Sequence, residues 1–171
     1  MPQPTVFERA GVAVRRVSVY CLFACAVCGA GQAQAAPSTF GPVIGSALLC
    51  RSELDNAYFY RWMVDNFGPS YKREGGAFWF KVEAKLWGAD VNEVMVSDDS
   101  SEVVFIAAVV DMAPDKLDEA IRVAAGPRHR AQDASRYPPR EAQPGSQIVY
   151  FKEKSKIYCL KYKPLPSLPA P

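Results

Sequence analysis

The stretch AFWFKVEAKLW, residues 77–87, alternates apolar side chains with a second set of aromatic and charged ones. Alternation over this length is typical of a β-strand with one buried face, because successive side chains point to opposite sides of a sheet. The set expected to face the core comprises Phe78, Phe80, Val82, Ala84 and Leu86. The set expected to face solvent or a partner comprises Trp79, Lys81, Glu83, Lys85 and Trp87. The stretch therefore predicts a sheet with one open face.

Further strands and two helices are predicted around this strand. Apolar residues at helical spacing predict one helix over residues 52–67, ended by Gly68-Pro69, and a second over residues 114–125, ended by Gly126. Apolar alternation and continuous apolar runs, bounded by turn residues, predict four more strands, at residues 91–97, 103–110, 147–153 and 156–163. Short connections between most strands favour antiparallel pairing.

The predicted fold class is therefore α+β, a single domain with the order α-β-β-β-α-β-β and a mainly antiparallel sheet that carries two helices on one face. We place the domain at residues 51–163, after a lead-in at 36–50 and before a proline-rich tail at 164–171. Residues 127–146 have no apolar period and are expected to form a mobile loop. Over residues 52–163 this element order is similar to the type III secretion chaperone-like fold. The resemblance includes no motif, and because those chaperones are acidic and cytoplasmic it implies no function here.

The first 35 residues have the pattern of a secretory signal peptide. Arg9, Arg15 and Arg16 precede an apolar run at residues 17–30, and Ala33-Gln34-Ala35 follows as a cleavage site. The run is too short for a stable membrane-spanning helix, so we expect none in the mature chain. The signal predicts an exported protein, periplasmic or secreted, in a bacterial cell.

Three cysteines in this segment, Cys21, Cys25 and Cys28, have the C-x3-C-x2-C spacing with which radical-SAM enzymes hold an iron–sulfur cluster. Such enzymes also need a long barrel that would follow this segment, and inside an apolar signal a cysteine is simply a small hydrophobe. An alternative is that Leu22-Phe23-Ala24-Cys25 resembles a bacterial lipobox, in which Cys25 would carry a lipid anchor. We favour cleavage after Ala35.

The two remaining cysteines, Cys50 and Cys159, predict a disulfide, because an even pair in an exported chain is usually oxidised. The alternative is two buried free thiols. Of the 20 basic and 18 acidic residues, three arginines and one glutamate lie in residues 1–35, which leaves 17 of each in the mature chain. A net charge of zero gives no reason to expect a nucleic-acid partner.

No motif for catalysis, metal binding or a cofactor is found. The chain has no G-x-S-x-G, Walker or G-x-G-x-x-G sequence, and Asp98-Asp99 lacks EF-hand spacing and is read as a solvated turn. The single histidine, His129, lies in the predicted loop, where we expect it to be solvated rather than catalytic. We therefore predict no cofactor and no catalytic residue, although a pair of carboxylates that meet in space would leave no sequence signal.

Two candidate binding surfaces remain. Four arginines in the predicted loop, Arg128, Arg130, Arg136 and Arg140, are candidates for binding an anion, with a solubilising charged loop as the alternative. The second candidate is the open sheet face. If Cys159 faces the core to reach Cys50, period-two geometry turns Tyr158, Leu160 and Tyr162 outward.

With Trp79, Lys81 and Trp87, these three residues would form a large aromatic patch, and such patches usually mark interfaces. The alternative is ordinary cross-strand pairing of aromatic side chains. We therefore expect a non-catalytic binding module that contacts a protein partner or a second copy of itself. A carrier of a small apolar or anionic ligand is the second hypothesis, and a hydrolase is the third.

Overall fold

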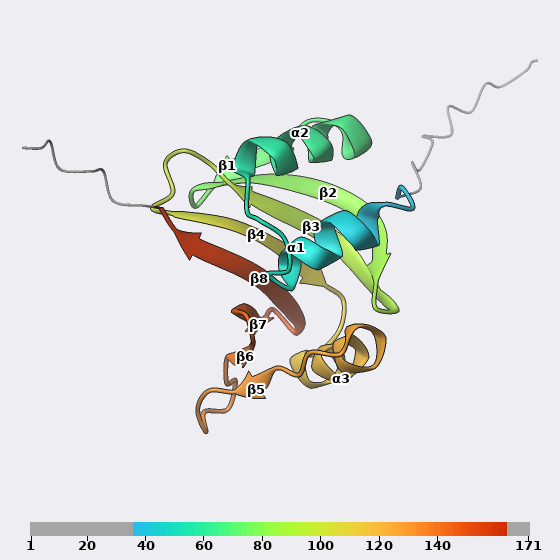
Figure 1. The fold of residues 1–171 in the computed structure, drawn as a ribbon, viewed down its shortest axis with the longest axis vertical. Coiled ribbons are helices and arrows are strands. Elements are labelled where there is room, and N and C mark those ends of the chain that lie inside the picture. The colour runs from blue at the N-terminus through green and yellow to red at the C-terminus, as the bar shows by residue number, and fades with distance from the viewer. Residues whose placement is uncertain (1–35, 164–171) are drawn as a thin grey trace, which may run out of the picture. The chain divides into compact units, whose positions relative to one another are not determined.

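The computed structural model describes residues 36–163. The candidate signal peptide, the alternative lipid anchor at Cys25 and the proline-rich tail lie outside the described residues. Within them, eight strands form one antiparallel sheet in the order β1-β2-β3-β4-β8-β7-β6-β5 (Figure 1). The strands are β1 Lys72–Glu74, β2 Ala77–Leu86, β3 Ala89–Ser97, β4 Val103–Val110, β5 Arg130–Ala131, β6 Arg140–Ala142, β7 Ser146–Phe151 and β8 Lys154–Tyr162.

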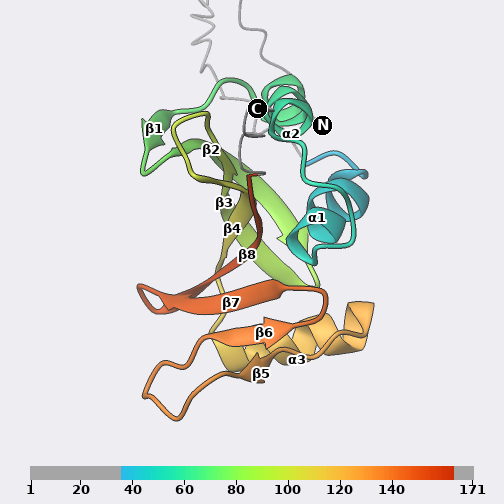
Figure 2. The same ribbon diagram turned by 60° about the vertical axis from the view of Figure 1, so that its left-hand side comes forward.

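The helices lie on one side of this sheet, whereas the β1–β2 and β7–β8 turns project to the other side (Figure 2). They are the π-helical turn η1 Gly41–Gly45, α1 Ser46–Leu48, α2 Asn56–Phe67 and α3 Pro114–Ala125. The predicted α+β class, the single sheet and the helix at 114–125 are confirmed. The structure adds η1, α1 and the short strands β1, β5 and β6 to the predicted order.

The lead-in at residues 36–50 is part of the fold. Phe40, Ile44 and Leu48 are almost fully buried in the main hydrophobic core, together with residues of α2, α3 and the sheet. At Gly45 the backbone comes so close to β2 that an added Cβ would lie 3.3 Å from Leu86 Cδ2. The small residues of this segment therefore let a short helix pack directly on the sheet.

Helix α2 begins four residues later than predicted. The Asp55 carboxylate accepts a hydrogen bond of 3.0 Å from the backbone N–H of Tyr58, which makes Asp55 the N-cap. Ser52, the first residue of the predicted helix, instead has a buried hydroxyl without a hydrogen-bond partner within residues 36–163. Both residues are good caps by type, and only the local backbone decides between them.

A disulfide joins Cys50, just after α1, to Cys159 in β8, as predicted. The Cα atoms are 5.3 Å apart although 109 residues separate the cysteines in sequence. Because β8 lies between β4 and β7 in the sheet, the bond ties the start of the domain to a central strand. It also places Cys159 on the helix side of β8, which sends Tyr158 and Leu160 to the opposite face.

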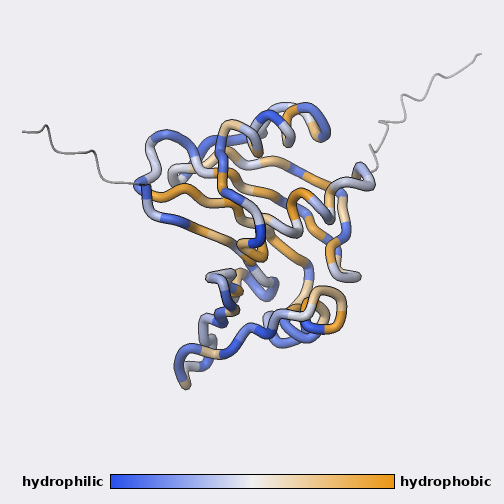
Figure 3. The backbone as a smooth tube through the Cα atoms, in the orientation of Figure 1, coloured by the Kyte–Doolittle hydropathy of each residue, from blue (hydrophilic) through white to orange (hydrophobic). Residues whose placement is uncertain are grey.

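Residues 127–146, predicted to form a mobile loop, contain β5 and β6, and β6 pairs with β7 in register from Arg140↔Ile148 to Ala142↔Ser146. The residues of this part of the chain are mostly hydrophilic, whereas those of the central strands β3 and β4 are mostly hydrophobic (Figure 3). The sequence therefore gives no period from which to predict two strands of two and three residues.

Candidate binding groove on the open sheet face

A second, smaller apolar cluster lies on the sheet face away from the helices. Its buried members are Ala77, Met95, Ala107 and Val109, and its partly buried members are Trp79, Phe105, Phe151 and Tyr158. The continuous apolar sequence of β4 is explained by this cluster, because alternate residues of that strand are covered on each face. The open face thus carries an apolar surface of its own.

The strand register gathers these side chains into rows across the sheet. Trp79 pairs with Met95, Met95 with Ala107, and Ala107 with Tyr158. The small side chain of Ala107 therefore lies between larger ones in the middle of the sheet. One consequence is a depression on this face with aromatic groups on both sides.

We call this depression the open-face groove. Its volume is about 640 Å³, and its walls include Trp79, Phe105, Tyr158 and Leu160. Residues of the β1–β2 hairpin and of the β7–β8 turn line it, and these two turns project on the same side of the sheet (Figure 2). Phe151 at the end of β7 and Lys152 of the β7–β8 turn line one side of it, and Lys72 and Glu74 of β1 line the other.

Lysine side chains lie against the aromatic rings of the groove. The Lys72 Nζ is 3.9 Å from the centre of the Trp79 ring and forms a 2.9 Å ion pair with Glu74. The Lys156 Nζ is 4.3 Å from the centre of the Phe151 ring and 5.4 Å from that of Trp79. Burial lowers the pKa of Lys156, although the charge of Glu93 opposes this shift. None of the ion pairs within residues 36–163 includes Lys156.

Glu93 lies in the row next to the groove and already has partners. Its carboxylate accepts a 2.8 Å hydrogen bond from the Tyr71 hydroxyl and pairs with Lys81. Burial would raise the pKa of Glu93, but these two contacts outweigh it and the pKa is lowered. The sequence candidate Lys81 is therefore engaged in a cross-strand ion pair on this face.

Of the aromatic candidates, Trp79 and Tyr158 line the groove with Leu160, and Tyr162 lies on the same face of β8 with its side chain 83 % exposed. Trp87 lies elsewhere, contrary to the alternation. The Trp87-Gly88 turn has positive φ at both residues, 52° and 83°, as the type I′ two-residue hairpin turn requires. The strand ends at Leu86, and Trp87 packs against the helix-side core near Gly45.

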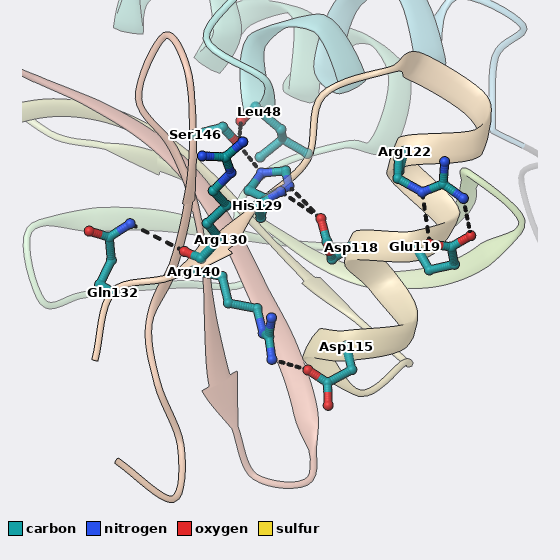
Figure 4. A network of polar contacts seen from close by, with 10 residues as sticks. All are labelled: Leu48, Asp115, Asp118, Glu119, Arg122, His129, Arg130, Gln132, Arg140 and Ser146. Carbon is teal, nitrogen blue, oxygen red and sulfur yellow. Dashed lines mark hydrogen bonds and ion pairs between the residues drawn. The ribbon is translucent and has the colours of Figure 1, made fainter. Parts of the chain in front are cut away.

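The four arginine candidates do not form one site. Arg128 and Arg130 line a hollow that also contains Glu141, whereas Arg136 and Arg140 line a separate one. Arg140 forms an ion pair with Asp115 of α3 (Figure 4). The charge of the predicted anion site is thus divided between two places and partly neutralised.

His129 is buried rather than solvated, which corrects the expectation from the sequence. Its Nε2 lies 3.0 Å from the Ser146 Oγ, its Nδ1 lies 3.5 Å from an Asp118 oxygen, and its backbone N–H donates a 2.6 Å hydrogen bond to the same oxygen (Figure 4). The Ser146 hydroxyl donates a 2.8 Å hydrogen bond to the Leu48 carbonyl. We call these four residues the His129 network.

An Asp–His–Ser series suggests nucleophilic catalysis, but its geometry here does not serve that purpose. The Ser146 hydroxyl donates its hydrogen bond to the Leu48 carbonyl, so the histidine Nε2 acts as the donor to the Ser146 Oγ. Ser146 and His129 are each only 1 % exposed, which keeps the hydroxyl away from a substrate in solvent. The network instead connects α1, α3 and β7, and no residue pattern in the sequence marks it.

Comparison with protein-family models, curated proteins and solved structures finds no match to this chain. Within residues 36–163, no three histidine, cysteine or acidic side chains come together as metal ligands. In the same part of the chain, no helix is long and apolar enough to cross a membrane.

Proposed function

We propose that the protein is a non-catalytic binding module and that its open-face groove holds an extended segment of a partner protein. The observation that carries this proposal is the groove itself, an apolar depression of about 640 Å³ with aromatic walls on a sheet face that no helix of residues 36–163 covers. Aromatic side chains at the centre of a surface patch are characteristic of protein interfaces.

The shape of the groove favours a peptide over a small molecule. Small-molecule sites enclose most of their ligand, whereas this groove runs openly between two hairpin turns. The space between helices and sheet, where a carrier would hold its ligand, is filled by fully buried side chains such as Ile44, Met63 and Leu117. No observation therefore favours the carrier.

We propose further that the protein works outside the cytoplasm. The disulfide between Cys50 and Cys159 is compatible with an oxidising compartment. Together with the signal-peptide pattern of residues 1–35, it supports export to the periplasm or the medium.

Selection from a library of displayed random decapeptides tests the binding function without knowledge of the natural partner. We expect enriched peptides to bind the wild-type protein and to lose binding to Trp79→Ala and Phe105→Ala. Tyr58→Ala is the matched control, because Tyr58 is an aromatic residue of α2 that is 50 % exposed and outside the groove. The proposal fails if no peptide is enriched, or if the groove variants bind as well as the control.

A further inference from the structure

We infer that the partner segment carries a carboxylate two residues from an apolar side chain, and that Lys156 binds this carboxylate at the floor of the groove. This inference rests on the proposed binding function. It adds the chemistry that the groove would select.

Lys156 is half-buried and lines the open-face groove. An ammonium group has three donors, which water in the groove satisfies until a carboxylate replaces it with a charge-assisted hydrogen bond. Among the side-chain contacts of residues 36–163, Lys156 has ring contacts with Phe151 and Trp79 but neither a hydrogen bond nor an ion pair. Its neighbours also leave it exposed to the groove, which it lines.

The charges around the groove are unevenly paired. Lys72 is paired with Glu74, Lys81 with Glu93 and Lys154 with Asp111. In the described part of the chain Lys152 and Lys156, both on the β7–β8 side, form no ion pair, and Glu93, whose charge reaches Lys156, is already paired with Lys81. An anionic ligand group would complement this side, and the lysine-free wall formed by Phe105 and Leu160 would take an apolar group.

The spacing of side chains along β8 matches that of an extended peptide. Lys156 and Tyr158 are alternate residues of β8 and point to the same face, about 6.6–6.8 Å apart along the strand. Alternate residues of an extended peptide have this same separation. A peptide that runs along β8 would therefore place a Glu or Asp at Lys156 and, two residues on, an apolar side chain beside Tyr158 and Ala107.

Defined peptides test this pattern. The first probe is acetyl-Ala-Glu-Ala-Phe-Ala-amide, the second has Gln in place of Glu, and the third has Glu and Phe adjacent. Titration followed by isothermal calorimetry at low salt should show the first probe binding about tenfold more tightly than the other two, as expected for one charge-assisted hydrogen bond.

Variants of the lysine assign the preference. Lys156→Met keeps the length of the side chain and should bind the Glu and Gln probes equally, whereas Lys156→Arg should retain the preference. Lys154→Met is the matched control, since Lys154 pairs with Asp111 and does not line the groove. Thermal melting of each variant shows whether it is folded. If Lys156→Met is unstable, the comparison of Lys156→Arg with the wild-type protein still tests whether a positive charge at this position is what prefers the Glu probe.

The outcomes separate the inference from the proposed function. Equal binding of the Glu and Gln probes to the wild-type protein would overturn the carboxylate anchor and leave the groove as a binding site. Failure of all probes, together with no enrichment from the decapeptide library, would overturn both. Binding of dodecanoate that depends on Lys156, without binding of any peptide, would show that the anchor serves a small amphiphile and would overturn the peptide.

Discussion

The imidazole of His129 and the hydroxyl of Ser146 form a buried 3.0 Å hydrogen bond between the segment before β5 and the first residue of β7. Ser146 in turn reaches the carbonyl of Leu48 in α1. Gly145, next to Ser146, lies beside the sulfur of Cys50. The hydrogen bonds of Ser146 and the disulfide therefore stabilise the same junction between the start of the domain and its last strands.

Removal of the Ser146 hydroxyl should destabilise this junction. Ser146→Ala leaves both the Leu48 carbonyl and the His129 Nε2 without their partner in a buried place, which costs about 1–3 kcal/mol of the free energy of unfolding. Urea denaturation followed by circular dichroism measures the loss. Ser52→Ala is the control, since the buried hydroxyl of Ser52 has no partner to lose and its removal should cost nothing. Equal effects of the two substitutions would contradict the role of the network.

The stability of the protein should fall as the pH drops below about 6.5. Burial lowers the pKa of His129 against the opposing effect of Asp118, with the charge of Arg140 acting in the same direction as burial. The unfolded histidine has a pKa of about 6.5, so below that pH the unfolded chain binds a proton that the folded chain resists. The stability that the neutral His129 contributes is therefore complete above about pH 6.5 and is lost as the pH falls toward the lower pKa of the folded state.

Denaturation at pH 7.5 and at pH 5 measures this dependence, and His129→Gln supplies the comparison. Glutamine can still donate a hydrogen bond toward Ser146 but does not titrate. Its difference in stability between the two pH values should be smaller than that of the wild-type protein. A difference of the same size would assign the pH dependence to other groups.

Reduction of the disulfide should cause a large loss of stability. A cross-link between cysteines separated by 109 residues contributes about 4–5 kcal/mol through the reduced entropy of the unfolded chain. We expect Cys50→Ala/Cys159→Ala to lower the free energy of unfolding by this amount, and dithiothreitol to act on the wild-type protein but not on the double variant. A wild-type protein that dithiothreitol does not affect would show that the cross-link adds no stability.

The sequence predicts the parts of this fold that depend on a repeated pattern. β2, β4 and α3 appear where alternation, an apolar run and helical spacing place them, and the disulfide follows from the number of cysteines outside the signal pattern. β5 and β6 are too short to show a period. The lead-in has Phe40, Ile44 and Leu48 at helical spacing, but Gly41-Pro42 and Gly45 between them are residues typical of a loop. His129 is buried by contacts with Asp118 and Ser146, residues 11 and 17 positions away, and nothing local to it indicates that environment.

The groove is predicted in part, for the same reason. Period two places Trp79, Tyr158 and Leu160 on the open face, but the row that joins them through Met95 and Ala107 depends on strand order and register. The sequence likewise does not predict that Phe151 lines the groove or that Lys156 forms no ion pair within the described residues, because both depend on the neighbouring strands. The period-two spacing of side chains therefore predicts the open face but not the groove on it.

Trp79 and Trp87 should differ sharply when each is replaced by serine, although the alternation of β2 assigns both to one face. Trp87 packs against the helix-side core, so Trp87→Ser should lower the free energy of unfolding by about 2–4 kcal/mol. Trp79 lies over the groove, so Trp79→Ser should cost less stability and instead abolish the binding of selected peptides. Thermal melting and peptide titration of the two single variants measure both effects. A Trp79→Ser protein that unfolds while Trp87→Ser stays stable would reverse the assignment of core and groove, since it would make the open face the more important packing surface.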